Sequence, residues 1–245
     1  MIKIENVEVV GLDHAIRGMR NPMNSWDKSD SGTCTDYNNR GLCQQYEDCF
    51  KECPRMGYDE EEFILGPNDL DLANRLAKGG PVHAKYRRMM VVYLDITAPL
   101  YWWKEFDTYK VGTVANSCST MHKIHDKEFE LDDFSCEHLD IRTTKLLKDT
   151  IDMLNEYRHL YVDYDADDFE VKGCPSKKDI WWQMIQLLPS SYNQRRTIMM
   201  NYEVLVGMYR DRKNHKLDEW RELCKWIESL PYSEIITGEV KESEE

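Results

Sequence analysis

Short polar side chains gather in one segment of the chain, directly after an aromatic-rich stretch. Thr113, Asn116, Ser117 and Ser119 lie within seven positions and offer three hydroxyls and an amide. A cluster of small donors and acceptors suits the polar atoms of a bound ligand better than it suits a hydrophobic core. A turn-rich connector has the same composition, so the residue types alone leave both interpretations open.

A second group of residues could present a ligand-binding face nearer the C-terminus. A helix predicted over residues 192–212 carries, at positions i, i+4, i+7 and i+11, the residues Asn201, Leu205, Met208 and Arg212. The two ends of this set lie about 20° apart around the helix axis and about 16 Å apart along it. A planar ligand of three rings could lie there, between the Asn201 amide and the Arg212 guanidinium. An Asn bonded to backbone and an Arg that reaches solvent are the alternative.

Thiols and imidazoles are the remaining candidates for chemistry. Four of the eight cysteines follow the spacing C-x8-C-x5-C-x3-C, namely Cys34, Cys43, Cys49 and Cys53. Four thiolates can hold a structural zinc ion, but zinc sites usually contain tight cysteine pairs, so we predict free thiols and no metal. Cys118 could be a nucleophile or a small packing residue. His122 and His125 could act as acid and base or bind a metal, although such a pair without a third ligand is usually structural.

The composition bounds the class of protein. The chain has 245 residues and a net charge of −13, so it can bury a substantial core and repels nucleic-acid backbones. No apolar run approaches the length of a membrane helix, about 20 residues, and the first residues lack a signal-peptide layout. We therefore expect a cytoplasmic protein with reduced cysteines and with neither nucleic acid nor membrane as a partner.

Hydrophobic periodicity predicts the elements that must position these residues. Alternation predicts strands over residues 4–12 and 89–97, and Thr97 is expected to cap a tryptophan-rich helix with Pro99 in its first turn. Capping residues and apolar stripes predict helices over residues 68–78, 138–161, 176–188 and 192–212, and a last helix striped by Leu217, Trp220, Cys224 and Ile227. Strands early in the chain and helices late indicate an α+β fold.

The chain is predicted to form a single α+β domain over residues 1–245. Residues 20–58 are rich in Asn, Asp, Ser, Gly and Cys, which predicts a Cys-rich irregular insertion with a short helix near residues 42–50. Residues 238–245 are predicted to be a flexible acidic tail.

The polar segment also resembles the signature of a known family. After an aromatic helix begun by a proline, flavin-dependent thymidylate synthases carry the signature RHR-x2-S-x-NE-x-S-x-RY. Residues 108–122 read TYKVGTVANSCSTMH, with one residue inserted before the Asn. Asn116 and Ser119 match the signature, and Thr113 matches it conservatively.

A second segment resembles the same family. There, a Leu-Pro pair is followed after twelve residues by an Asn and after eleven more by an Arg. Leu188-Pro189, Asn201 and Arg212 keep those spacings, and a further family cluster follows with an offset of one, at His215, Glu219 and Trp220. A Gly-His turn that touches the flavin in the family corresponds to residues 79–83. The resemblance covers about residues 65–231 and implies an α+β fold with a central, mostly antiparallel sheet and long helices.

This resemblance implies a methyltransferase of dTMP biosynthesis. In the family, FAD mediates transfer of a one-carbon unit from methylenetetrahydrofolate to C5 of dUMP, NADPH supplies electrons, and the flavin sites lie between the subunits of a homotetramer. The implied FAD-binding residues are Tyr109, Lys110, Thr113, Asn116, Asn201, His215 and His83. The implied residues for a pyrimidine deoxynucleotide are Glu105, Ser117, Ser119 and Arg212. Arg212 would also be the catalytic cation that polarises the pyrimidine carbonyl.

The sequence departs from the family at the substrate phosphate. Three arginines that serve this phosphate in the family are replaced, at Thr108, Met121 and Ile185. Each lost charge-assisted bond costs about 1.5–3 kcal/mol of binding free energy unless other cations compensate. The candidate replacements are Lys104, Lys110, Lys123, Arg195 and Arg196. The alternatives to the enzyme are therefore a divergent nucleotide-binding or interaction protein that keeps the fold, and a zinc-stabilised structural protein.

Overall fold

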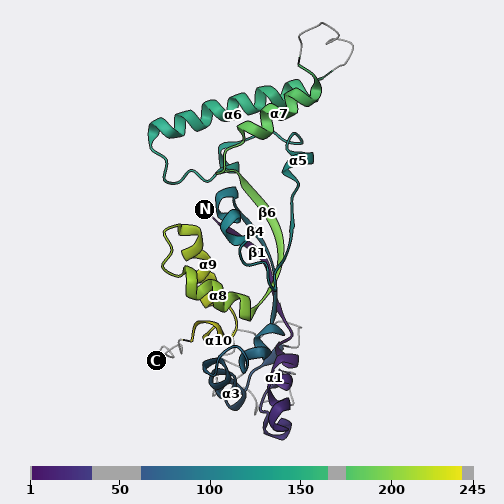
Figure 1. The fold of residues 1–245 in the computed structure, drawn as a ribbon, viewed down its shortest axis with the longest axis vertical. Coiled ribbons are helices and arrows are strands. Elements are labelled where there is room, and N and C mark those ends of the chain that lie inside the picture. The colour runs from purple at the N-terminus through teal and green to yellow at the C-terminus, as the bar shows by residue number, and fades with distance from the viewer. Residues whose placement is uncertain (1, 35–61, 165–174, 239–245) are drawn as a thin grey trace. The chain divides into compact units, whose positions relative to one another are not determined.

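A computed structural model describes residues 2–34, 62–164 and 175–238 of the chain (Figure 1). Most of the predicted insertion, including the short helix near residues 42–50, lies outside the described residues, as do Cys43, Cys49 and Cys53. Residues 239–245 of the predicted acidic tail also lie outside them. Among the described residues, no helix combines the length and the apolar character that crossing a bilayer requires.

The described residues contain a four-stranded sheet. In spatial order its strands are β1 (Lys3–Val10), β4 (Val91–Pro99), β6 (Asn193–Asn201) and β5 (Val114–Ser117). Backbone hydrogen bonds join Leu100, after the end of β4, to Tyr192, before the start of β6. They also join Tyr202, after the end of β6, to Met90, before the start of β4. These bonds make the two central strands antiparallel, which confirms the predicted α+β class with an antiparallel sheet.

Strand β4 follows the predicted alternation. Val92, Leu94 and Ile96 are buried, whereas Tyr93 between them is exposed. Period-two burial of this kind places one face of a strand against a core. The strand continues through Thr97 to Pro99, so the prediction that Thr97 caps the next helix is wrong. Pro99 is the N-cap of α4 (Leu100–Phe106).

The structure differs most from the prediction over residues 192–212. The single predicted helix is instead strand β6 followed by helix α8 (Tyr202–Arg212). Ile198 and Met200 are buried while Thr197 and Arg195 are exposed, so this stretch has the period of a strand. The chain changes from strand to helix at Asn201, whose side-chain oxygen accepts a hydrogen bond from the N–H of Val204 at 3.1 Å.

The polar segment of residues 113–119 is also more regular than predicted. Residues 114–117 form β5, an exposed strand, where the sequence predicts a loop. Ser119 then caps the short helix α5 (Thr120–Lys123), accepting a hydrogen bond from the N–H of His122 at 3.1 Å. This exposed strand forms here because the neighbouring β6 supplies its backbone hydrogen bonds.

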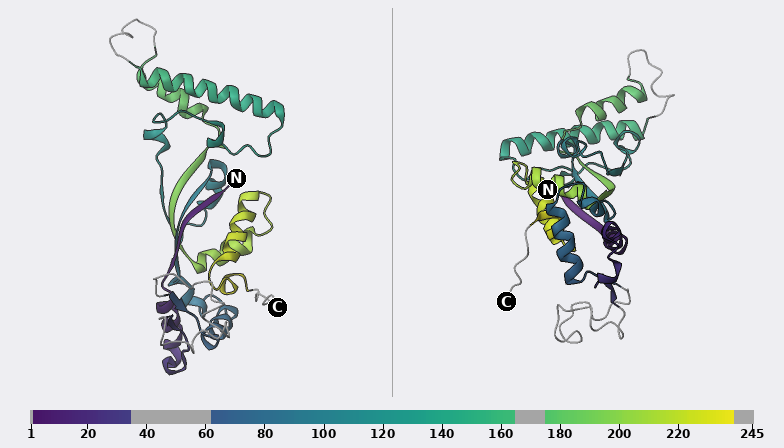
Figure 2. Two further views of the ribbon diagram at one scale, coloured as in Figure 1. Left: turned by 180° about the vertical axis from the view of Figure 1, so that it is seen from behind. Right: turned by 60° about the horizontal axis from the view of Figure 1, so that its bottom comes forward.

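The chain divides into two compact units. The first comprises residues 1–6, 94–110 and 114–198. It contains α6 (Ile141–Val162) and α7 (Lys177–Leu187), which lie side by side in both views (Figures 1 and 2). Both helices were predicted within three residues of their observed ends. Their shared core consists of Ile124, Phe129, Phe134, Leu147, Ile151, Leu154 and Met184.

The second unit comprises residues 7–93, 111–113 and 199–245. Its helices are α1 (Leu12–Arg20), α3 (Pro67–Lys78), α8, α9 (Asp218–Ser229), α10 (Glu234–Thr237) and the 3-10 helix η3 (Ala84–Arg88). A small antiparallel pair, β2 (Gly32–Cys34) with β3 (Glu62–Ile64), belongs to it as well. Helix α8 packs against η3, α9 and α10. The predicted α3 ends at Lys78 as expected and begins at Pro67, just before the expected cap.

Candidate functional site

In the second unit, Asn201 lies beside the start of the polar segment. Gly112 has a φ of +81°, and a Cβ there would lie 3.0 Å from Cγ2 of Val204 and 3.2 Å from Nδ2 of Asn201. Only glycine fits this approach, because a larger residue would be strained in φ and crowded in space. The structure thus places Asn201 next to Gly112, the residue before Thr113. Asn201 and Thr113 are two of the residues predicted to bind the cofactor.

Two polar groups near Gly112 have hydrogen-bonding atoms that could contact a ligand. The buried hydroxyl oxygen of Thr113 has no hydrogen-bond partner among the described residues. The Oδ1 of Asn201 is used by the helix cap, which leaves its amide nitrogen on the side of Gly112 as a donor. Buried polar atoms without hydrogen-bond partners are uncommon, so we expect the Thr113 hydroxyl to bond to a ligand or to a water molecule. A hydroxyl and an amide suit the carbonyl oxygens and ring nitrogens of a flat heteroaromatic ligand.

Arg212 and His215 form a separate group at the C-terminal end of α8. The guanidinium carbon of Arg212 lies 4.6 Å from the centre of the Trp220 ring, which is a cation–π contact. The His215 ring approaches the same indole edge-on at 6.3 Å. Its Nδ1 accepts a hydrogen bond from the N–H of Leu217 at 3.2 Å.

The helical face between Asn201 and Arg212 is not open to a ligand. Leu205 and Met208, the two residues between them on this face, are fully buried. They belong to the face with which α8 packs inside the second unit. The expectation that a planar ring lies along this face is therefore wrong, because the apolar spacing that suggested it is the spacing of a core helix. Asn201 and Arg212 mark two ends of a packed helix.

The remaining residues predicted to bind cofactor or substrate lie in a turn, in or just after helix α4, and on strand β5. His83 is exposed in the turn after α3, where its N–H donates to the carbonyl of Gly80 at 3.0 Å. The carbonyl oxygen of Glu105 in α4 accepts the hydroxyl hydrogen of Thr108 at 2.8 Å. Tyr109 and Lys110 follow α4, and Asn116 and Ser117 lie on the exposed strand β5.

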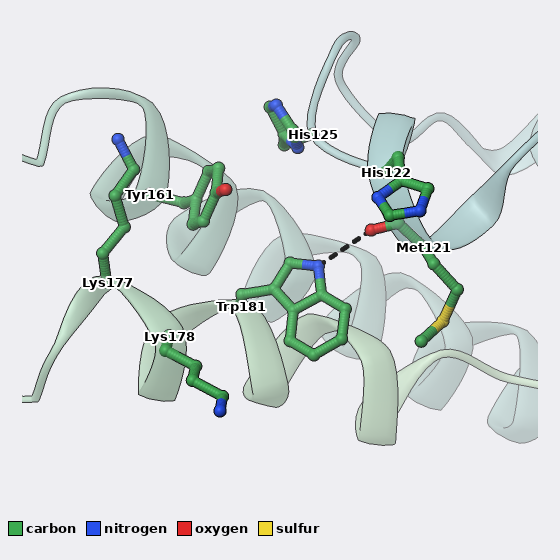
Figure 3. A pocket seen from close by; sticks show the side chains of 7 residues that line it. All are labelled: Met121, His122, His125, Tyr161, Lys177, Lys178 and Trp181. Carbon is green, nitrogen blue, oxygen red and sulfur yellow. Dashed lines mark hydrogen bonds between the residues drawn. The ribbon is translucent and has the colours of Figure 1, made fainter.

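A cavity of about 320 Å³ lies in the first unit, where the start of α7 meets α5 and the end of α6 (Figure 3). It is lined by Met121, His122, His125, Tyr161, Lys177, Lys178 and Trp181. The indole nitrogen of Trp181 donates to the carbonyl oxygen of Met121 at 3.0 Å and so ties α7 to α5. Of this lining, only the two histidines and Met121 were singled out from the sequence. The other residues were read as parts of two helices, and no local signal shows that these helix ends meet.

The cavity is cationic although the chain is acidic. Lys177 lies over the Tyr161 ring, with its Nζ 4.9 Å from the ring centre. The Nδ1 of His125 is buried and has no hydrogen-bond partner in the described part of the chain. The nearby Asp126 lies 3.5 Å from Nε2 of His125 and is also paired with Lys123. Two ammonium groups and two imidazoles beside aromatic rings suit an anionic ligand with an aromatic part.

One further carboxylate lies beside this lining without entering it. Asp179 on α7 accepts hydrogen bonds from the hydroxyl and the N–H of Ser176, and these bonds lower the pKa of its carboxyl. The two residues form the capping box that begins α7. The charge of Asp179 is therefore used at the helix start, next to the two lysines of the cavity.

Several cations that were expected to compensate for the missing arginines are engaged elsewhere. Arg195 donates to Asp95 at 2.7 Å, and hydrogen bonds from Thr197, Arg195 and Asn6 hold the pKa of the Asp95 carboxyl well below its usual range. Arg196 donates to Asp107 at 2.8 Å and stacks on Trp103. These two arginines therefore contribute to the sheet and its surroundings, and are not free to bind a phosphate.

The cysteines within the described residues do not form a metal centre. No group of three or more His, Cys, Asp and Glu side chains that could hold a metal occurs in the described ranges. Cys118 is exposed, and its carbonyl oxygen accepts a hydrogen bond from Gln194 at 3.0 Å. Burial raises the pKa of the Cys224 thiol to about 11, which makes it an inert core residue.

Comparison with known proteins identifies the fold. No family model matches the sequence, and no curated protein matches it in sequence. The chain is similar to a crystal structure of thymidylate synthase X (ThyX) from Helicobacter pylori with FAD and dUMP, with a TM-score of 0.57, 15% identity and 97% of each chain covered. A second structure of this enzyme, complexed with FAD and dUMP, gives a TM-score of 0.53 and 16% identity over 95% of this chain and 97% of that one. The chain thus has the α+β fold of the ThyX flavin-dependent thymidylate synthases.

Proposed function

We propose that this chain is a divergent member of the flavin-dependent thymidylate synthase family and a methyltransferase. Its reaction would be FAD-mediated transfer of a one-carbon unit to C5 of a pyrimidine deoxynucleotide, dUMP or a variant of it. The observation that carries the proposal is the similarity over 97% of both chains to a structure that holds FAD and dUMP. Methylenetetrahydrofolate and NADPH as co-substrates, a homotetramer and a cytoplasmic location complete the proposal.

The residues around Gly112 fit the cofactor. The amide nitrogen of Asn201 and the buried hydroxyl of Thr113 would donate to polar atoms of the flavin ring system. Tyr109, Lys110 and Asn116 would bind the rest of FAD, with His83 and His215 as further contacts. When bound, FAD supplies the redox chemistry, while the protein sets position and charge.

Arg212 would hold the pyrimidine. A guanidinium stays charged at any working pH and stabilises negative charge that develops on a pyrimidine carbonyl. Its contact with Trp220 fixes the plane of the guanidinium in advance, which reduces the entropy lost on binding. Ser117, Ser119 and Glu105 would contact the sugar and the phosphate. Lys177 and Lys178 are further cations of the first unit that can receive an anion.

Binding without turnover is the second candidate function. Thr108, Met121 and Ile185 replace arginines of the family, and Arg195 and Arg196 are paired with carboxylates. A substrate phosphate without arginine forks would bind more weakly by orders of magnitude. A protein of this kind would keep the flavin or nucleotide site and lose the reaction.

Two measurements separate the candidates. Titration of the purified protein into FAD, followed by quenching of flavin fluorescence, tests the cofactor. An assay with dUMP, methylenetetrahydrofolate, NADPH and FAD, followed by chromatography of dTMP, tests the reaction. FAD binding with dTMP formation that is lost in Arg212→Ala supports the enzyme, and FAD binding without dTMP supports the binding protein. A protein that neither binds nor quenches FAD contradicts the cofactor and the enzyme together.

A further inference from the structure

None of the side chains proposed above to contact FAD or the pyrimidine lines the cavity at the start of α7 (Figure 3). The volume of this cavity, about 320 Å³, lies at the low end of the range for small-molecule sites, about 300–1,000 Å³. Such a space suits a ligand of one ring system with one charged group, and it is too small for a dinucleotide such as FAD. The cavity is therefore a candidate for a second ligand.

Two aromatic rings of the lining are held in place by contacts within the chain. The indole nitrogen of Trp181 donates to the carbonyl oxygen of Met121 at 3.0 Å, while the indole itself is only half-buried. The Tyr161 ring contacts the His125 ring, with 4.6 Å between the two ring centres. Aromatic side chains fixed in this way offer contact area to a flat ligand at a small cost in conformational entropy. The lining therefore favours a ligand that contains a ring.

Lys177 supplies a cation to the same cavity. Its Nζ lies 4.9 Å from the centre of the Tyr161 ring and 5.8 Å from that of Tyr164, and no salt bridge within the described ranges involves it. Lys177 is also the first residue of α7, an 11-residue helix whose N-terminal end carries a partial positive charge. The ammonium group and the helix end together favour an anion in this cavity.

His125 offers a buried nitrogen that lacks a partner. Its Nδ1 has no hydrogen-bond partner in the part of the chain that the structure describes, whereas its Nε2 lies 3.5 Å from Asp126. A buried polar atom costs free energy unless it forms a hydrogen bond, which a ligand can supply. A doubly protonated imidazole donates from both nitrogens, so Nδ1 can donate to an anion while Nε2 faces the carboxylate.

A phosphate matches these donors better than a carboxylate does. A carboxylate has one negative charge on two oxygens, whereas a phosphate monoester carries about −1.5 to −2 charges at pH 7 and has three strong acceptor oxygens. The lining offers two ammonium groups and two imidazoles, which exceed what a single charge can use. The ligand chemistry that fits is thus a phosphate monoester next to a ring.

We propose that this cavity binds a phosphate monoester with a single ring system. The ring contacts the Trp181 indole, and the phosphate binds the Lys177 ammonium and Nδ1 of His125. This site goes beyond the proposed function, because it requires neither FAD nor Arg212.

The first test compares ligands by isothermal titration calorimetry of the full chain at neutral pH. Phenyl phosphate, which has both the ring and the phosphate, is expected to bind about tenfold more tightly than inorganic phosphate, because the ring adds contacts with the aromatic lining. Benzyl alcohol, which has the ring without the charge, should not bind measurably. No saturable binding of phenyl phosphate at millimolar concentration overturns the proposal. Equal affinities for phenyl phosphate and inorganic phosphate overturn the role of the ring.

The second test removes single donors. Lys177→Ala and His125→Ala should each weaken phenyl phosphate binding about tenfold, since each removes a charge-assisted hydrogen bond. Lys148→Ala is the matched control, because Lys148 is an exposed lysine of α6 outside the lining, and its loss changes the net charge by the same amount. Lys177 is also exposed, so Lys177→Ala should keep the wild-type circular dichroism. Equal affinities in Lys177→Ala and Lys148→Ala overturn the proposal.

A third comparison separates this site from the proposed cofactor and substrate sites. Arg212→Ala should bind phenyl phosphate as tightly as wild type does, and Lys177→Ala should quench FAD fluorescence as wild type does. Loss of phenyl phosphate binding in Arg212→Ala would place the ligand at the proposed pyrimidine site and overturn a separate site. A wild-type protein that binds phenyl phosphate but not FAD would contradict the proposed cofactor and leave this site supported.

Discussion

Asp69 is a buried carboxylate that joins three segments of the second unit. Its oxygens accept hydrogen bonds from Arg20, from the hydroxyls of Ser29 and Ser31 at 2.6 Å, and from two backbone N–H groups. Burial alone would raise the pKa of this carboxyl, but the hydrogen bonds outweigh burial and hold the pKa below its usual value. The charged form of Asp69 is thus the form that stabilises the fold.

Asp69→Asn should therefore destabilise the protein strongly. The variant leaves the buried guanidinium of Arg20 without its counter-charge, and losses of this kind cost about 3–5 kcal/mol of unfolding free energy. Asp71→Asn is a matched control in the same helix, because Asp71 and its partner Arg75 are exposed and their pair contributes less than about 0.5 kcal/mol. Urea denaturation at neutral pH measures both. Equal losses of unfolding free energy in the two variants would show that the buried ion pair stabilises the fold no more than the exposed one.

The same residue predicts a dependence of stability on pH. Because the pKa of Asp69 is lower in the folded than in the unfolded state, its contribution is complete above the unfolded value of about 3.9. The contribution is lost as pH falls through the folded pKa, since the unfolded chain takes up the proton first. The stability difference between wild type and Asp69→Asn should therefore shrink from pH 6 toward acid. A stability difference between wild type and Asp69→Asn that grows on acidification would contradict this prediction.

Asn201 has two functions that substitution can separate. Asn201→Ala removes the cap of α8 and should cost about 1 kcal/mol of unfolding free energy, whereas Asn201→Asp keeps a capping oxygen and should stay near wild type. Both lose the amide donor and should bind FAD about three- to tenfold more weakly. Denaturation and fluorescence titration measure the two effects. Wild-type FAD affinity in Asn201→Asp would exclude the amide from the site.

At the level of elements, the approach of Gly112 to α8 fixes the polar segment beside Asn201. Gly112→Ala should cost at least about 1 kcal/mol more than Gly80→Ala in urea denaturation. Both positions have positive φ, but a Cβ at Gly80 meets nothing within 4 Å, whereas one at Gly112 meets Val204 and Asn201. The comparison isolates the close contact from the backbone strain. Equal costs would mean that the segment does not pack against the start of α8.

The error over residues 192–212 has a physical cause at this level. The run from Ile198 to Met200 is apolar throughout, and short apolar runs do not distinguish a strand from a helix by period. Residues 202–212 do form a helix, and the helical spacing from Asn201 onward was correct. Pairing with β4 decides the first half, because its backbone groups find partners there that a helix would not use. Helices α6 and α7 begin at residues whose side chains cap them, and α9 has a clear apolar stripe, so the sequence predicted all three well.

For the whole molecule, FAD binding should appear as added stability. At a free FAD concentration of about 100 times the Kd, the folded state gains about 2.7 kcal/mol. For a chain of this size that gain corresponds to a rise in Tm of about 5–10 °C, measurable by differential scanning calorimetry. Asn201→Asp should show a smaller rise at the same FAD concentration. No rise at saturating FAD would contradict the proposed cofactor.

Consecutive residues were enough to predict most of the described helices, the alternation of β4 and the α+β class. That Asn116, Ser119 and the spacing from Pro189 to Arg212 belong to the flavin-dependent thymidylate synthase signature stays a prediction from the sequence. These features are local, because capping, periodicity and motif spacing are written in consecutive residues. Long-range contacts, by contrast, make β5 and β6 strands and bury the face of α8 between Asn201 and Arg212. They also bring His122, Lys177 and Trp181 to the lining of one cavity. Strand pairing, burial and the meeting of helix ends depend on residues far apart in the chain, and no window of the sequence contains both sides of such a contact.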